Sequence, residues 1–318
     1  MKLIKTSALI IILFGTLNLK PATVCGAFLD DGWGARPLGL GGAYTALGDD
    51  ANSQLYNPAG IWQAEEFEAA FMYARLFTGL DKVDLGMNYA SAVLPVSNWL
   101  NIGILWAGMM SASQYREDTF AVTGAMPMSD SIFSGINLKY LSHGYTLDAR
   151  TLDDPVFESG SSKGAFSADI GAQWFVFEDE KQRVLLGLSA KNINRPDVGL
   201  KTQDIVPTEY RLGFAMTFFG RTSVSPSIDF SYRGQDWGNE SDKMNVYAGC
   251  ETGFFNRLLT VRAGINVNEM TTGLGYSPVL RGVMISVDYA FVAPLNIRES
   301  AGTHRVSLTM RFTTVPAE

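Results

Sequence analysis

Few residues in this chain could do covalent chemistry. It has two histidines, His143 and His304, and two cysteines, Cys25 and Cys250. A hydrolase needs a nucleophile and a base within hydrogen-bond reach of each other. Ser142 precedes His143, but neighbours on a β-strand point to opposite faces and do not form such a pair. We therefore expect no enzymatic activity, no catalytic residues, no metal site and no cofactor.

The polar side chains of this chain belong to strands. Residues 303–312 read THRVSLTMRF, in which polar and mostly apolar positions alternate strictly with a period of two. Such alternation is typical of a strand with one polar and one apolar face. The pattern recurs and predicts about fourteen strands, near residues 67–75, 83–94, 100–109, 118–127, 132–143, 164–177, 183–193, 208–219, 223–233, 243–253, 258–267, 270–277, 281–291 and 303–312.

The first residues resemble an export signal. Residues 1–26 combine two early lysines with an apolar stretch from Ala8 to Leu17, which is shorter than the roughly 20 apolar residues that span a bilayer. We expect a signal peptide over residues 1–26, cleaved after Gly26 or Ala27. An uncleaved anchor helix and a lipoprotein signal at Cys25 remain alternatives.

The charge of the chain is acidic. Without the three lysines of residues 1–26, the net charge of −7 becomes −10. Nucleic-acid-binding proteins need basic surfaces, so we expect no nucleic acid as partner.

Export and strand alternation together predict an all-β fold, a transmembrane antiparallel β-barrel over residues 67–312 with residues 313–318 as a periplasmic tail. Aromatic residues fall near the expected strand ends, where girdles form at the membrane interfaces, and we expect both histidines at an interface. The predicted connections are five residues or fewer on one side and mostly longer on the other, as in outer-membrane barrels. A soluble β-sandwich is the alternative. The predicted location is the outer membrane of a Gram-negative-type bacterium, surrounded by its lipid.

Fourteen strands enclose a lumen that wall side chains alone do not fill. We expect the polar wall residues to face inward; they are Asn88, Asn137, Lys139, Asp169, Gln173, Lys191, Arg211, Asp229, Arg233, Glu251, Arg262, Asp288, Arg305 and Arg311. The segment before the barrel, within residues 27–66, is rich in glycine and carries apolar side chains worth burying. Irregular backbone at membrane depth must be surrounded by protein or water. We therefore expect residues 27–66 to form an N-terminal hatch inside the lumen.

Two sequence runs resemble a known family. The run GARPLGLGGAYTALGDDANSQLYNPAGI, which starts at Gly34 and contains Asn57-Pro58-Ala59, is similar to the N-terminal hatch of the FadL-type outer-membrane transporters and their PorV/PorQ relatives. Residues 302–312, GTHRVSLTMRF, are similar to the last strand of the PorV/PorQ branch. The resemblance implies a fourteen-stranded barrel with a luminal hatch.

What the resemblance implies about function is the passive transport of hydrophobic, fatty-acid-like molecules across the outer membrane. Such a ligand leaves water favourably, at about 25 cal/mol per Å² of apolar surface buried. The implied ligand and hatch residues are Asn57, Pro58, Ala59, Gly41 and Gly42. Pro226 cannot donate to a strand ladder and marks a possible wall defect or an ordinary strand end.

The resemblance to PorV supports an alternative. In it, the barrel is a scaffold or shuttle of type IX protein secretion, with a secreted protein or another secretion-system component as partner and no small-molecule transport. In either case we expect Phe312 to be the signal that the barrel-assembly machinery recognises. Residues 313–318 follow that aromatic residue and depart from the pattern of typical relatives.

Overall fold

The computed structural model describes residues 27–28, 32–81, 83–112, 114–149, 151, 154–234, 244–297 and 299–312 of the 318-residue chain. The predicted signal peptide, residues 1–26, and the predicted tail, residues 313–318, lie outside the described residues. Within these ranges, no helix is long and apolar enough to cross a bilayer.

Strands form nearly all of the described chain. They are β1 (Glu68–Leu76), β2 (Leu85–Ser97), β3 (Leu100–Ser111), β4 (Tyr115–Pro127), β5 (Ile132–Tyr145), β6 (Ser162–Glu178), β7 (Gln182–Lys191), β8 (Thr208–Phe218), β9 (Thr222–Gly234), β10 (Met244–Phe254), β11 (Leu259–Asn266), β12 (Glu269–Tyr276), β13 (Val279–Leu280), β14 (Val283–Pro294) and β15 (Thr303–Phe312). Each predicted segment overlaps one strand. The two-residue β13, which the sequence does not predict, only extends the turn before β14.

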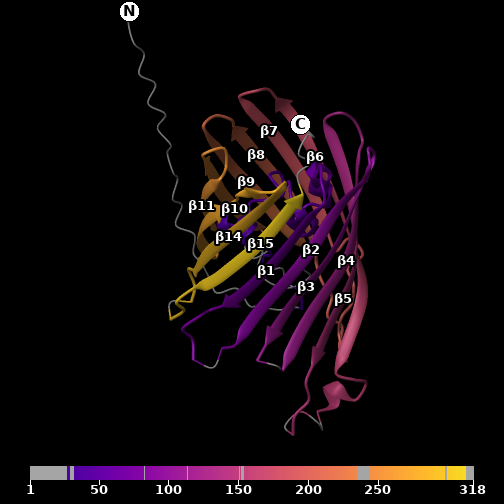
Figure 1. Cartoon of the computed structure of the whole chain (residues 1–318). Helices are drawn as coiled ribbons and strands as arrows, with labels where there is room; N and C mark the ends of the chain where they lie inside the picture. Colours follow the sequence, from indigo (N-terminus) through magenta and orange to yellow (C-terminus); the bar gives the residue numbers. More distant parts are fainter. Residues whose placement is uncertain are drawn as a thin grey trace, which may run out of the picture.

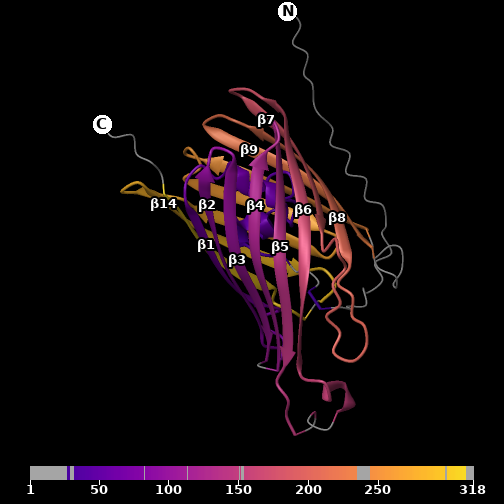
Figure 2. The ribbon, with the colours of Figure 1, turned by 90° about the vertical axis from the view of Figure 1, so that its right-hand side faces the viewer.

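The wall is a closed barrel of fourteen antiparallel strands (Figures 1 and 2). Successive strands pair with each other, β12 pairs with β14, and the ring closes where β1 pairs with β15, with Glu68 opposite Arg311. A closed ring gives every strand a neighbour on both sides, as a membrane-embedded sheet requires. The predicted fold class is confirmed.

The two ends of the barrel have different connections. We call the end with the turns after β2, β4, β6, β8 and β10 the short-turn rim, and the opposite end the long-loop rim. Residues 146–161 and 192–207 connect strands at the long-loop rim, and the first of these includes the short helix η3 (Pro155–Phe157) at the bottom of Figure 1. The predicted asymmetry holds, with short exceptions at residues 112–114 and 267–268.

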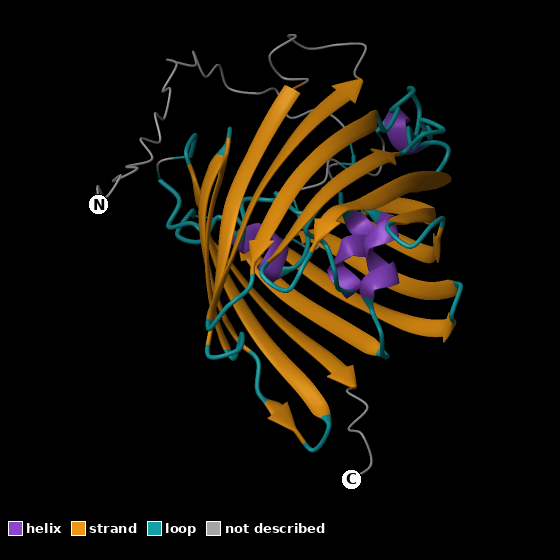
Figure 3. Cartoon of the chain, turned by 90° about the horizontal axis from the view of Figure 1, so that it is seen from above, coloured by secondary structure: helices purple, strands orange, loops and turns teal. Residues whose placement is uncertain are grey.

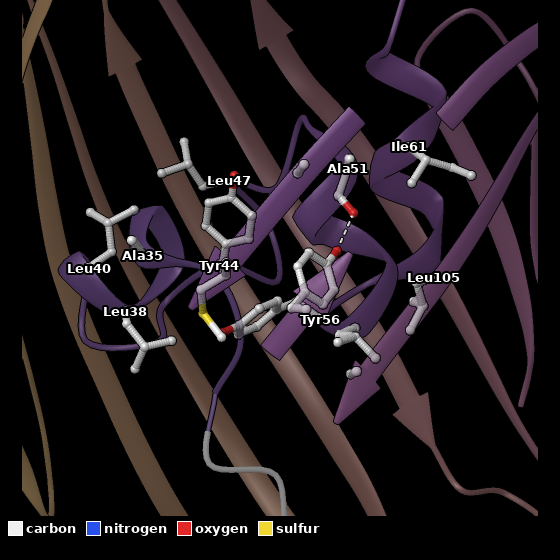
Figure 4. Packing of buried hydrophobic residues seen from close by; sticks show 14 of the residues in the cluster. Ala35, Leu38, Leu40, Tyr44, Leu47, Ala51, Tyr56, Ile61 and Leu105 are labelled. Carbon is white, nitrogen blue, oxygen red and sulfur yellow. Dashed lines mark hydrogen bonds between the residues drawn. The ribbon is translucent and has the colours of Figure 1, made fainter. Parts of the chain in front are cut away.

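The segment before β1 lies inside the ring of strands. It contains α1 (Ala35–Gly39), η1 (Ala51–Leu55) and η2 (Pro58–Gln63), and Figure 3 shows these helices within the barrel. Its apolar side chains form the main buried cluster of the protein. In Figure 4, Tyr44 lies between Leu38 and Leu40 on one side and Tyr56 on the other. The structure thus places residues 32–66, which we call the hatch, in the lumen.

Most of the polar residues predicted to face inward are buried in the lumen, but Asn88 is not. On β2, Met87, Tyr89 and Val93 are the buried residues, so Asn88 lies on the opposite face. The reason is that the hatch presents apolar side chains to this part of the wall, which turns the apolar face of β2 inward. The prediction that His143 lies at an interface is also wrong. His143 is buried, with Nε2 2.7 Å from the carbonyl oxygen of Val198.

Candidate functional site

The hatch backbone touches the wall at a series of glycines. These glycines lie on the inner faces of β5, β6, β7, β8, β10 and β11, and a Cβ atom built on any of them would lie closer than 3.0 Å to a hatch atom; they are Gly135, Gly171, Gly187, Gly213, Gly249 and Gly264. Real Cβ atoms do not approach so closely. The wall therefore fits the hatch main chain through the absence of side chains. Sequence reasoning noticed the glycines of the hatch but not these.

Asn57 connects the hatch to itself and to the wall. Its side-chain oxygen accepts a hydrogen bond from Ala59 N at 3.2 Å, which starts η2, and its Nδ2 donates to Thr45 O and Ala172 O, both at 2.9 Å. Asn57 is fully buried, and Pro58 occupies the first position of η2, where a missing N–H costs nothing. The Asn57-Pro58-Ala59 motif thus anchors the hatch to β6.

Gly41 and Gly42 form the second predicted hatch feature. Both have positive φ angles, 67° and 89°, which favour glycine. Gly41 N donates to Thr271 Oγ1 at 3.0 Å, and Asn266 Nδ2 donates to Gly41 O at 3.2 Å. The glycine pair lies on the side of the lumen opposite Asn57, so the predicted site residues hold two separate ends of one plug.

A buried ion network joins the hatch to the wall near the short-turn rim. The Arg36 guanidinium lies 2.5 Å from Asp49, 3.0 Å from Asp50 and 3.0 Å from Glu251 of β10. Glu251 also accepts from Arg257 and, at 2.6 Å, from Arg262. Burial acts to raise the pKa of Asp49, but the charge and hydrogen bond of Arg36 outweigh it and hold that pKa below its ordinary value. The sequence offers no signal for the pairing of Arg36 with Glu251.

A second group of ion pairs lies closer to the long-loop rim. Lys139 lies 2.7 Å from Asp169, and Glu209 lies 2.5 Å from Arg211 and 2.9 Å from Arg233. These pairs balance luminal charges of both signs. No group of three or more His, Cys, Asp or Glu side chains that could hold a metal ion occurs within the described ranges.

Between the hatch and this second group lies a small cavity. It has about 60 Å³ of free space and is lined by Trp33, Leu55 and Met87 together with polar groups that include Glu117 and Asn192. An engineered cavity that binds benzene has about 150 Å³. This cavity is therefore too small for even a monoaromatic molecule, and passage through it requires the hatch or the loops to move.

The wall beside this cavity contains a seam. Pairing between β6 and β7 begins at Ile170 opposite Ala190, and nearer the long-loop rim the edge of β6 has no strand partner among the described pairings. The Asn194 side chain replaces the partner, since Nδ2 donates to Phe166 O at 2.8 Å and Oδ1 accepts from Ala168 N at 3.1 Å. Asn194 also lines an apolar groove of about 1290 Å³ on the outer surface of β1–β6.

Pro226 lies in the middle of β9, not at a turn. It faces Cys250 on β10, and the β8–β9 ladder omits the two pairs between Ala215–Ser227 and Phe218–Val224 without a change of register. Thr217 and Ser225 bridge this gap through their hydroxyl groups, 3.0 Å apart. Whether Pro226 marks a functional wall defect stays a prediction.

Phe312 ends β15 at the short-turn rim. Its ring lies 5.5 Å from that of Phe67, and its N–H donates to Phe67 O at 3.0 Å. The side chain is exposed on the outer face. Its predicted role in recognition by the assembly machinery remains a prediction.

Comparison with known proteins finds similarity at the level of structure. No family model and no curated protein sequence matches this chain. Among solved structures, the toluene transporter TodX of Pseudomonas putida superposes with a TM-score of 0.57 at 10% identity over 89% of this chain and 99% of its own. The toluene transporter TbuX of Ralstonia pickettii gives 0.56 at 11% over 90% and 100%. A FadL homologue of Pseudomonas aeruginosa gives 0.56 at 11% over 88% and 98%.

These structural neighbours are transporters rather than enzymes, and they share the barrel fold with this chain. At such identities the likeness establishes the fold alone. This likeness does not confirm the PorV/PorQ branch.

Proposed function

We propose that this protein resides in an outer membrane and passively transports hydrophobic small molecules across it. The observation that carries the proposal is a hatch that fills the lumen of a closed barrel yet is held by separable contacts, at Asn57, Gly41 and Arg36. The likeness to transporters of toluene and to a FadL homologue supports the choice of apolar cargo. Monoaromatic and fatty-acid-like molecules are the candidate substrates.

The proposed route begins at the long-loop rim and passes through the luminal cavity. Asn57, Pro58 and Ala59 hold the closed hatch, and their release enlarges the cavity. The seam next to Asn194 offers an exit, because a few hydrogen bonds from Asn192, Ile193 and Asn194, rather than a strand ladder, close the wall there beside the outer apolar groove. An apolar molecule that leaves through the seam stays out of water, which favours this route over crossing the periplasmic side.

A reversible lock on the hatch tests the proposal. Ser227 Oγ lies 3.0 Å from Ala43 O, so cysteines at Ala43 and Ser227, in a Cys250→Ser background, place two thiols between hatch and β9. We expect uptake of radiolabelled toluene or oleate into proteoliposomes to stop on oxidation and to return on reduction. The Cys250→Ser chain alone is the control and should transport under both conditions. Unchanged uptake with a fully formed disulfide would refute transport through hatch movement.

Mass spectrometry of material that co-purifies in mild detergent separates this function from the alternative. A bound apolar molecule that is lost in Asn57→Ala supports transport. A stoichiometric secreted protein without a small molecule supports a PorV/PorQ-like role in type IX secretion instead.

A further inference from the structure

Glu117, like Asp229, differs from most carboxylates around the lumen. Most of them lie within 3.0 Å of a lysine or arginine nitrogen, as the pairs of Asp169, Glu209, Glu251 and Asp288 show. Glu117, on the inner face of β4, has no such ion pair with any described residue. Its carboxylate accepts from Tyr115 Oη at 2.6 Å and from the main-chain N–H of Phe28 at 3.2 Å. A partly buried carboxylate without a counter-ion is costly.

Among the groups around Glu117, only the imidazole of His143 can carry a positive charge. Tyr115 contributes a neutral hydroxyl, and Asp204 of the 192–207 connection adds a second negative charge. His143 of β5 contacts the rings of Phe28 and Tyr115, and its Nε2 faces the carbonyl oxygen of Val198 at 2.7 Å. The carboxylate of Glu117 therefore forms no ion pair with a described lysine or arginine, while Phe28 of the chain's own N-terminal segment lies against it.

Ala27 is fixed next to this carboxylate. It is only 9% exposed and packs in a cluster with Leu141, Val198 and Val206 near the long-loop rim. The amide that follows it, that of Phe28, is the group bonded to Glu117. The nitrogen of Ala27 is thus one peptide unit away from the carboxylate.

The sequence in front of Ala27 is one that a signal peptidase accepts. Val24 and Gly26 are small residues at the third and first positions before it, after an apolar stretch and two early lysines. Hydrolysis of the Gly26–Ala27 peptide bond breaks the C–N bond with one water molecule. Its hydroxyl completes the Gly26 carboxyl group and its proton goes to the Ala27 nitrogen, which takes up another proton from solvent at neutral pH.

We propose that Gly26–Ala27 is the processing site and that the α-ammonium group of Ala27 created there is the counter-ion of Glu117. Processing then completes the luminal site, since the uncleaved chain has a neutral amide where the mature chain has a cation. The pair holds the mature N-terminus in the half of the lumen next to the long-loop rim. The proposal does not depend on what the barrel transports.

The first test is the intact mass of the full chain purified from outer membranes. We expect a mature protein that begins at Ala27. A protein that begins at a lipidated Cys25, that keeps residues 1–26, or that begins at any other residue overturns the proposal.

The second test measures the basicity of the new amine. Reductive methylation with ¹³C-formaldehyde, which keeps the positive charge, allows the α-amine to be titrated by NMR. The ordinary pKa of such an amine is about 7.7–8.0. We expect the pKa of the wild-type amine to lie at least about one unit above this value, which is a tenfold change in proton affinity. Glu117→Gln should remove that difference.

Asp118→Asn is the matched control, because Asp118 is the next residue of β4 and bonds Trp106 and Arg116 rather than Phe28. Retained heat-modifiable mobility in gels shows that each variant is folded. Equal titration of the amine in the wild type and in folded Glu117→Gln would overturn the ion pair.

Discussion

At the scale of single residues, Arg36 is the side chain on which the closed hatch depends most. It is the only described residue that pairs with Asp49 and Asp50 of the hatch and also with Glu251 of the wall. Removing one partner from a buried ion network leaves the other charges uncompensated.

We predict that Arg36→Met destabilises the folded barrel by about 3–5 kcal/mol. The exposed pair of Arg116 with Asp118 provides the control, and Arg116→Gln should cost less than about 1 kcal/mol. Urea unfolding in detergent micelles measures both. A similar, small effect of both substitutions would contradict the role of Arg36.

The same network predicts a pH dependence. The pKa of Asp49 is lower in the folded protein than in the unfolded chain, so the stabilisation is present above the unfolded value of about 3.9 and is lost as pH falls through the lower folded value. We expect the stability difference between wild type and Asp49→Asn to be largest at neutral pH and to vanish in strong acid. Unfolding measured from pH 7 to pH 2 checks this.

At the scale of elements, the fit between hatch and wall depends on missing side chains. A Cβ on Gly187 would collide with the main chain at Thr45, whereas a Cβ on Gly124 of β4 has its nearest neighbour at 4.0 Å. The inner surface is therefore shaped for this hatch and not only for a barrel of this size.

We predict that Gly187→Val displaces the hatch, with a cost of about 1–3 kcal/mol, and that Gly124→Val does not. Displacement should expose Tyr44, which is buried in the seated hatch, to chymotrypsin under conditions that leave the strands intact. Equal resistance of the two variants to cleavage at Tyr44 would show that the contact at Gly187 is not what seats the hatch.

The elements also show what the sequence could predict. The strands were predictable because alternation with a period of two is a local property, and the end of β15 at Phe312 is read directly from it. The face of β2 that points inward was not predictable. Polar residues usually face the lumen of a barrel, but here the apolar hatch buries Met87 rather than Asn88. Contacts such as Arg36 with Glu251 join residues 215 positions apart, and no local pattern encodes them.

At the scale of the whole molecule, the barrel and hatch act as one folded unit. The hatch supplies the hydrophobic core of the lumen, and the wall supplies hydrogen bonds to its irregular main chain. Without the hatch, the inner wall would face water with its charges paired only among themselves.

We predict that deletion of residues 34–63 gives a barrel with a continuous aqueous pore. Planar bilayers should then show large, steady conductance, in contrast to the closed wild type. A deletion variant that folds, as judged by gel mobility, and yet stays electrically silent would mean that other segments block the lumen.

Closure of the ring between β1 and β15 has a consequence for biogenesis. The hatch directly precedes β1, but its anchors, Glu251 and Thr271, lie on strands that are synthesised late. The plug therefore cannot settle until β10 and β12 are in place. Once residues 68–75 pair with residues 304–311, the junction between β1 and β15 is closed, and the hatch cannot enter the lumen there. During insertion into the membrane, β1 and β15 must therefore stay unpaired until the hatch has entered the lumen.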